Sequence, residues 1–239
     1  MEFTIASFTG KGGRTVNEDS IFVKQEGDLC LAIVADGLGM HGGGEIASTL
    51  VIDVLSRYLL EHPTMNSNNI YDSFSAANQA LLLKQTAVCK MKSTAALLFS
   101  MDKKLAFAHV GDSRIYHFVN GAIRYQTLDH SVSQMAVAAG EITPSQIRFH
   151  EDRNRLLRAI GGESIRPEII ILDRPVSESD AFLLCSDGFW EYLNESEMEL
   201  DLMKSQSPQQ WLSFMLERVA RRIDSNNDNL SAITIFYKD

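Results

Sequence analysis

Four aspartates at the edges of apolar segments are the residues whose types and spacing best fit catalytic chemistry. Asp36, Asp112 and Asp187 each follow an apolar run and stand beside glycine or serine, and Asp228 stands just before the last apolar run. One such aspartate is ordinary, because aspartate favours turns. Strands of one core bring their ends to a common rim, where several carboxylates repel one another unless cations neutralise them. The four positions therefore predict a cation-binding rim.

A rim that offers only oxygen ligands suits Mg²⁺ or Mn²⁺, which prefer near-octahedral oxygen shells completed by water. Two such ions about 4 Å apart can activate a bridging water and stabilise an in-line displacement at phosphorus. Arg14 adds a guanidinium fork that matches two phosphate oxygens, although an arginine in a polar loop is, by itself, typical of a solvated surface. Together these residues indicate the hydrolysis of a phosphate ester.

Short strands are expected to position these residues. Apolar runs bounded by turn residues predict strands, several of them buried on both faces, over residues 29–35, 94–99, 105–110, 168–172, 181–185 and 232–237. Asn120-Gly121 predicts a two-residue hairpin turn between strands at 115–119 and 122–125, since this pair tolerates positive φ. At least one connection is therefore antiparallel.

Periodic apolar patterns predict helices over residues 45–60, 73–84 and 209–223. Thr143 and Ser207 are each followed by proline and, three residues on, by glutamine, which predicts a helix start at both sites. Helices and strands come in mixed order with a hairpin, which favours an α+β fold. Residues 1–239 show no repeat or linker and are expected to form a single domain.

Composition excludes several classes of protein. A hydrophobic content of 45% and a charged content of 22% disfavour disordered, collagen-like and disulfide-scaffold proteins, and Cys30, Cys89 and Cys185 are isolated residues expected in the core. With 22 Lys+Arg against 31 Asp+Glu, the net charge of −9 argues against a nucleic-acid binder. The start lacks a signal sequence, and no run approaches the roughly 20 apolar residues of a membrane span, so we expect a cytoplasmic protein.

Short motifs recur along the chain in a specific order: Arg14-x-x-Asn17-Glu18-Asp19, Ala35-Asp36-Gly37-x-Gly39, Gly43-Gly44-Glu45, Ser93-Thr94, Val110-Gly111-Asp112-Ser113-Arg114, Asp129-His130-Ser131, Leu157-Arg158-Ala159-Ile160-Gly161, Cys185-Ser186-Asp187-Gly188 and Asp228-Asn229-Leu230-Ser231. Their order and spacing resemble the metal-dependent protein phosphatases of the type 2C (PPM) family, in particular its compact bacterial single-domain members. The resemblance covers nearly the whole chain. It implies a four-layer α-β-β-α sandwich of two antiparallel sheets flanked by helices, with a flap subdomain at about residues 131–165 beside the active site.

The resemblance also implies a set of metal ligands. By position, Asp36 bridges two ions, the Gly37 carbonyl binds the first ion, and Asp187 and Asp228 bind the second. Asp112, together with Asp187, matches the site of a third ion in bacterial relatives. The implied cofactor is Mn²⁺ or Mg²⁺, with two ions per chain and a third at Asp112.

Further residues match groups that bind phosphate, water or a proton. Arg14 aligns with the phosphate-binding arginine, and Glu18 and Asp19 are expected to hold metal-bound waters. Eukaryotic members carry a histidine two residues after the bridging aspartate, where this chain has Leu38. His41 matches the histidine of the bacterial pattern and is the candidate proton donor to the leaving alkoxide, the alternative being a structural hydrogen bond in the glycine loop.

The reaction implied by the resemblance is hydrolysis of phosphoserine and phosphothreonine in proteins by in-line attack of a metal-bridging hydroxide. The expected partners are phosphorylated Ser/Thr proteins, among them a cognate bacterial Ser/Thr kinase, with no nucleic acid and no membrane, and the expected state is a monomer. The main alternative is a catalytically silent relative that binds phosphoproteins or acts as a scaffold. A two-metal nuclease or a small-molecule phosphatase is a further alternative.

Two other enzyme classes fit the sequence poorly. The spacing Gly37-x-Gly39-x-x-Gly42 matches a dinucleotide-binding loop, but Asp36 would face the pyrophosphate, and a polar loop follows the helix where a second strand is needed. No cysteine is followed six residues later by the arginine of a cysteine-dependent phosphatase. The histidines show no ligand-like pair spacing, and His109, within an apolar run, is expected to be a core residue.

Overall fold

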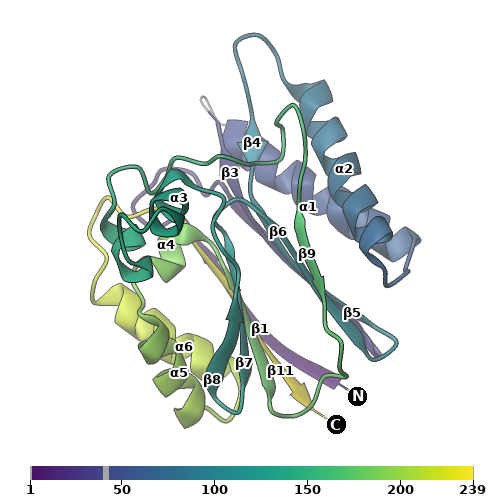
Figure 1. The fold of residues 1–239 in the computed structure, drawn as a ribbon, viewed down its shortest axis with the longest axis vertical. Coiled ribbons are helices and arrows are strands. Elements are labelled where there is room, and N and C mark those ends of the chain that lie inside the picture. The colour runs from purple at the N-terminus through teal and green to yellow at the C-terminus, as the bar shows by residue number, and fades with distance from the viewer. Residues whose placement is uncertain (1, 40–42, 239) are drawn as a thin grey trace.

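The computed structural model describes residues 2–39 and 43–238, which form two antiparallel sheets between two layers of helices (Figure 1). One sheet has the strand order β1-β11-β10-β7-β8. The other has the order β2-β3-β5-β6-β9, with β4 pairing with β3. The predicted α-β-β-α sandwich is confirmed.

The strands of both sheets come from distant parts of the chain. The first sheet consists of β1 (Glu2–Gly10), β7 (Arg114–Val119), β8 (Ala122–Gln126), β10 (Asp180–Cys185) and β11 (Leu230–Lys238). The second sheet consists of β2 (Asp19–Glu26), β3 (Leu29–Leu38), β4 (Lys92–Ser93), β5 (Ala95–Met101), β6 (Lys104–Val110) and β9 (Glu168–Ile171). The pairing of β1 with β11 joins the two ends of the chain.

Helices cover the outer face of each sheet (Figure 1). The long helices α1 (Gly43–Glu61) and α2 (Ser67–Lys84) pack on the second sheet. The first sheet is covered by α4 (Asp187–Trp190), α5 (Glu195–Lys204) and α6 (Pro208–Ala220). Three apolar cores result, one between each sheet and its helices and one between the sheets.

Strand β3 shows why the central strands are continuously apolar. Alternate side chains of a strand face opposite sides. Leu31 and Ile33 pack toward α1 and α2, whereas Ala32 and Val34 pack toward the other sheet. Because both faces are buried, the apolar run continues until it reaches Asp36 at the strand end.

All of the strands expected from apolar runs are present, with ends shifted by a few residues. The hairpin is also confirmed, since Asn120 and Gly121 have φ of 52° and 82° between β7 and β8. Ser207 begins α6, and its side chain accepts a hydrogen bond from Gln210 N. At Thr143 the expected helix start leads only into a short 3₁₀ helix, η1 (Pro144–Phe149).

The connection between β8 and β9 carries α3 (Val132–Ala138) and η1. Its η1 turn is anchored to the first sheet's helical layer, because buried Arg148 donates to the carbonyls of Trp190 and Leu193. From η1 the chain runs past β4 before it enters β9 (Figure 1). This connection contains the range expected for the flap. Within the described residues, no helix is long and apolar enough to cross a membrane.

Candidate active site and metal centre

Four elements of the two sheets bring the predicted aspartates to one end of the sandwich. Asp36 ends the apolar run of β3, Asp112 lies between β6 and β7, Asp187 begins α4 directly after β10, and Asp228 precedes β11. We call Asp36, Asp112, Asp187 and Asp228 the acidic rim. The charges of the other three rim residues all raise the pKa of Asp36, which shows that the four carboxylates lie together.

Asp36 lies near the end of β3, opposite Asp19 of the neighbouring strand β2. Burial, and then the charges of Asp187 and Asp19, hold the pKa of Asp36 well above its usual range. Its backbone is fixed on both sides, because Asp36 N donates to Thr94 Oγ1 over 2.9 Å and its carbonyl accepts from Thr94 N over 2.8 Å. The Ser93 hydroxyl donates to the same carbonyl over 3.0 Å. The Ser93-Thr94 pair therefore positions the centre of the rim.

Asp112 and Asp187 are the most buried members of the rim, with 4% and 9% exposure. Burial raises the pKa of Asp112 to about 7, and burial followed by the charge of Asp112 raises that of Asp187. Among the side chains that the structure describes, Asp112 Oδ1 is the buried polar atom without a hydrogen-bond partner. Buried carboxylates are costly unless a cation or donors compensate them. This donor set of carboxylate oxygens therefore fits a hard divalent cation.

Asp228 is half-buried and pairs with Arg14 from the loop after β1. Arg14 Nε and Nη2 donate to the two carboxylate oxygens of Asp228 over 3.0 and 2.8 Å. The hydrogen bonds and charge of Asp228 raise the pKa of Arg14. The Arg14 side chain is 55% exposed, so its fork, here occupied by Asp228, lies at the edge of the rim where a phosphate could compete for it.

Glu18 and Asp19 lie immediately behind the rim at the start of β2. Asp19 is opposite Asp36 in the β2–β3 ladder and accepts a hydrogen bond from Ser186 Oγ over 2.7 Å. Burial raises the pKa of Asp19 to about 6 and also raises that of Glu18. Glu18 and Asp19, the two acids predicted to hold metal-bound waters, therefore both lie beside the rim.

Gly37 has no room for a side chain. A Cβ at this position would lie 1.9 Å from Gly44 O and 2.8 Å from Glu18 O, so the end of β3 can approach the start of α1 only through glycine. Its amide donates to Glu18 O over 3.1 Å. The predicted ligand Gly37 therefore lies beside Asp36 and Glu18. The predicted proton donor His41 lies outside the described residues.

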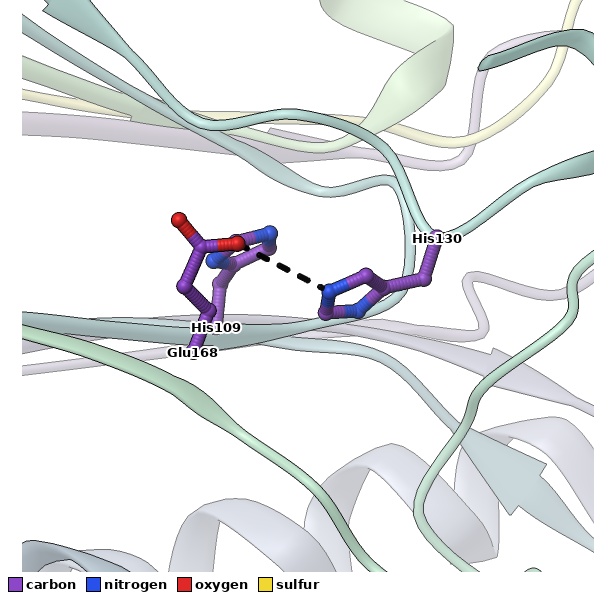
Figure 2. Close-up of side chains that lie close together, drawn as sticks. All are labelled: His109, His130 and Glu168. Carbon is purple, nitrogen blue, oxygen red and sulfur yellow. Dashed lines mark ion pairs between the residues drawn. The ribbon is translucent and has the colours of Figure 1, made fainter. Parts of the chain in front are cut away.

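A second cluster of titratable groups, which the sequence did not predict, adjoins the rim at Gly111. Figure 2 shows His109, His130 and Glu168 converging from β6, from the stretch after β8 and from β9. The two imidazole rings stack at 4.6 Å, and His130 Nε2 lies 4.0 Å from Glu168 Oε2. These residues are 21 to 59 positions apart in sequence, so no local spacing could reveal them. The Asp129-His130-Ser131 motif was the one available signal.

The hydrogen bonds of this cluster disfavour a cation. His130 Nδ1 accepts from Gly111 N over 3.1 Å, which leaves the ring proton on Nε2, the nitrogen that a metal would need. Arg158 Nη1 lies 3.4 Å from the same Nε2. Burial, then the charges of His109 and Arg158, lower the pKa of His130 to about 3. Since His130 N also donates to Gly111 O over 2.9 Å, the histidine fixes the residue that precedes Asp112.

Behind Asp112 lies a buried ion pair that the sequence also did not reveal. Arg114 donates to both carboxylate oxygens of Asp129 over 2.7 Å, and both side chains are 2% exposed. The guanidinium stacks on Trp190 at 3.4 Å, and Trp190 Nε1 donates to Asp112 O over 2.9 Å. The loop that carries Asp112 is therefore held by donors on its backbone. Trp190 and Trp211 are buried in the core, and the predicted core position of His109 is confirmed, with its ring paired with Leu128 O at 2.9 Å.

Comparison with sequence families places this site in a known context. A family model described as "Protein phosphatase 2C" matches residues 12–233. The chain is 32% identical over 179 residues to "Serine/threonine protein phosphatase PstP" of Mycobacterium tuberculosis, covering 73% of this chain but only 34% of that protein. It is 30% identical over 247 residues to "Protein phosphatase PhpP" of Streptococcus pneumoniae, covering 98% of this chain and 96% of PhpP. The chain thus spans about a third of the length of PstP and nearly all of PhpP.

Solved structures agree with these sequence matches. The crystal structure of the Mycobacterium tuberculosis phosphatase PstP superposes with a TM-score of 0.87 at 26% identity, covering 99% of each chain. A structure of the PstP catalytic domain in complex with two manganese ions superposes with a TM-score of 0.85 at 25% identity, again covering 99% of each chain. The similarity therefore extends over the whole sandwich.

Proposed function

Because this chain belongs to the protein phosphatase 2C family, we propose that it is a metal-dependent protein serine/threonine phosphatase. One observation carries the proposal above all. Three strand ends and a helix start of the two sheets bring together carboxylates that raise one another's pKa, and the buried Asp112 Oδ1 among them has no donor. Burying carboxylates that repel one another destabilises the fold unless a cation is bound, so this arrangement suits a metal centre. The Arg14 guanidinium at its edge suits a phosphate.

The predicted ligands would bind the metal ions as follows. Asp36 would bridge two ions, the Gly37 carbonyl would complete the first site, and Asp187 and Asp228 would bind the second. Asp112 would share a third ion with Asp187. Bound Mn²⁺ or Mg²⁺ would supply Lewis acidity and lower the pKa of water. The burial of Asp112 and Asp187 and the raised pKa of Asp36 support these roles, as does the manganese in the related PstP structure.

Other residues would bind the substrate and handle water and protons. Arg14 would bind two phosphate oxygens, which requires it to exchange at least part of its pairing with Asp228 for the substrate. Glu18 and Asp19, behind the rim, would orient water within the site. His41 would donate a proton to the leaving alkoxide. A lower rate of His41→Ala on phosphopeptides, with aryl phosphate hydrolysis retained, would support that role, and equal losses on both would remove it.

We assign residues 131–165 as a flap within a single domain over residues 1–239. Large apolar side chains of this region are unusually exposed, with Met135 at 61%, Phe149 at 85% and Leu157 at 51%. Exposed apolar groups of this size suit contact with a substrate protein. The proposed substrates are cytoplasmic proteins phosphorylated by a bacterial Ser/Thr kinase, and the proposed state is a monomer. Phosphoproteomics of a deletion strain against its parent tests the substrates.

Manganese-dependent hydrolysis tests the activity itself. Purified protein is expected to hydrolyse p-nitrophenyl phosphate and phosphothreonine peptides when Mn²⁺ is present, and to stop when a chelator is added. Asp36→Asn is expected to abolish turnover, whereas Asp53→Asn, an exposed aspartate on α1, is expected to retain it. No turnover by the wild-type protein with Mn²⁺ would favour a silent phosphoprotein-binding relative. Preference for a nucleic acid would favour a two-metal nuclease, and preference for a small metabolite would favour a small-molecule phosphatase.

A further inference from the structure

A pocket of about 380 Å³ lies beside the acidic rim and is lined mainly by the connection between β8 and β9. The apolar part of its lining comes from Leu38, Leu156, Leu157 and Ala159. Three cationic side chains surround it, Lys92, Arg158 and Arg166, against one acidic side chain, Glu163. In a chain with a net charge of −9, this gathering of positive charge is local and distinct.

The pocket reaches the strand that carries Asp36 through its lining residue Leu38. Strand β4 pairs with the end of β3 so that Ser93 is opposite Gly37 and Lys92 is opposite Leu38. Leu38 lies two residues beyond Asp36, roughly 7 Å along an extended strand. A peptide whose phosphorylated side chain reaches Asp36 would therefore lay residues two to three positions away over the pocket. The proposal rests on the phosphatase function proposed above.

The cations of this pocket are not committed to neighbours, unlike most arginines of the protein. Arg114, Arg148, Arg174 and Arg218 all pair with carboxylates. Among residues 2–39 and 43–238, neither Lys92 nor Arg166 has an ion-pair or side-chain hydrogen-bond partner, and both are exposed. The polar partner of the Arg158 guanidinium within the same described ranges is the ring of His130, at 3.4 Å from Nη1 to Nε2. Cations held beside a cavity without partners are available to an anionic ligand.

We propose that the pocket formed by Lys92, Arg158 and Arg166 selects phosphoprotein segments with acidic side chains two to three residues from the phosphorylated residue. The carboxylates of such a segment would pair with the cations, while its backbone and aliphatic stems would lie along Leu156 and Leu157. Without this pocket, the acidic rim and the overall negative charge would repel an acidic segment. The positive charge of the pocket instead attracts an acidic segment at the place where the substrate would bind.

The test compares two phosphothreonine peptides that differ only in glutamate or glutamine at the second and third positions on either side. The wild-type kcat/KM is expected to be about tenfold higher for the glutamate peptide, since two exposed ion pairs together contribute about a tenfold effect. The double variant Lys92→Gln, Arg166→Gln is expected to bring the ratio close to one. The matched control is Arg57→Gln, Arg124→Gln, which removes the same charge from exposed arginines elsewhere and is expected to keep the ratio.

Charge reversal provides a second readout. Lys92→Glu, Arg166→Glu is expected to favour a lysine peptide over the glutamate peptide, and the wild-type preference is expected to shrink as salt rises. An equal wild-type rate on both peptides, an unchanged ratio in the pocket variant, or the same loss in the control variant would each overturn the proposal. If the wild-type protein turns over both peptides and p-nitrophenyl phosphate, such a result leaves the phosphatase function intact. If it turns over none of them, the phosphatase function fails first.

Discussion

Buried carboxylates of the acidic rim and of the interior of the first sheet differ in whether they have cationic partners. Asp129 and Asp180 are buried and paired with Arg114 and with Arg174 and His117 respectively. Hydrogen bonds from His117, Arg174 and Ser177 hold the pKa of Asp180 well below its usual range. Asp112 is equally buried, yet its Oδ1 has no partner and its pKa is raised to about 7. The interior carboxylates are therefore compensated by the fold, whereas the buried Asp112 of the rim is left for a cation.

The two regions also differ in whether hydrogen bonds form to the backbone or to the side chains. At Asp36 and Asp112 of the rim the hydrogen bonds go to the backbone: Ser93 and Thr94 bond to the peptide groups of Asp36, and Trp190 donates to the carbonyl of Asp112. In the interior the side chains themselves are bonded. This contrast separates a site built to bind a cation from ion pairs built to hold the fold.

The largest expected effect is on catalysis. Asp36→Asn is expected to lower the rate of Mn²⁺-dependent p-nitrophenyl phosphate hydrolysis by at least about 10³-fold, because a bridging ligand is lost. Its unfolding midpoint in chelator is expected to be no lower than that of the wild-type protein, since one of several repelling charges is removed. A variant that loses activity only because it unfolds would contradict the contrast between rim and interior.

Removing a cation from the interior is expected to act on stability. Arg114→Met leaves the buried carboxylate of Asp129 without its partner and is expected to lower the free energy of unfolding by about 3 kcal/mol. Urea denaturation measures this loss. The double variant Arg114→Met, Asp129→Leu removes both charges and is expected to recover much of it. A double variant as unstable as the single one would show that the pair is not coupled.

The rim residue Asp112 and the adjoining Asp19 also predict a pH dependence, opposite in sign to that of Asp180. The folded-state pKa values of Asp19 and Asp112, about 6 and about 7, are raised above the usual value of 3.8, so both groups stabilise the metal-free fold at low pH. That stability is lost as pH rises from about 4 through 7, by at most about 1.4 kcal/mol per pH unit and group. Urea titrations in chelator are expected to show the decline. Stability rising steadily from pH 5 to pH 8 would contradict it.

Arg14 is expected to matter least for stability, although its two bonds to Asp228 resemble those of Arg114 to Asp129. The Arg14 side chain is 55% exposed, so Arg14→Met is expected to change the free energy of unfolding by no more than about 0.5 kcal/mol. The same variant is expected to raise KM for p-nitrophenyl phosphate. Steady-state kinetics beside urea denaturation separate the two effects, and a large loss of stability would place Arg14 with the interior pairs.

Much of the rim and of the fold could be predicted from the sequence because its signals are local. Strand ends followed by aspartate, the Asn120-Gly121 turn and the amphipathic helices all depend on neighbouring residues. Strands β1 and β2 were not predicted from the sequence. In β1, polar Thr4 and Ser7 interrupt the apolar pattern, and the strand is defined by its pairing with the far end of the chain. In β2, polar residues likewise flank a short apolar stretch. Helix α5 was missed because Met198, Leu200 and Leu202 alternate as in a strand, although Asn194 and Glu197 form a capping box.

The interior pairs and the pocket could not be predicted, for the same reason in each case. Asp129 and Arg114 lie 15 residues apart in the sequence, and Asp180 and His117 lie 63 residues apart. Lys92 and Arg166 share one pocket only because β4 pairs with β3 and the chain returns past β4 on its way to β9. Contacts set by tertiary folding leave no periodic trace in the sequence.

Direct measurement of metal binding tests the central claim, that the acidic rim is a metal centre. In a calorimetric titration of metal-free protein with Mn²⁺, the wild-type chain is expected to bind at least two ions. Asp187→Asn is expected to weaken or lose this binding, whereas Asp129→Asn, in the interior, is expected to retain it if the variant folds. Binding of Mn²⁺ by Asp187→Asn with unchanged stoichiometry and affinity, or no binding by the wild-type protein, would contradict the account.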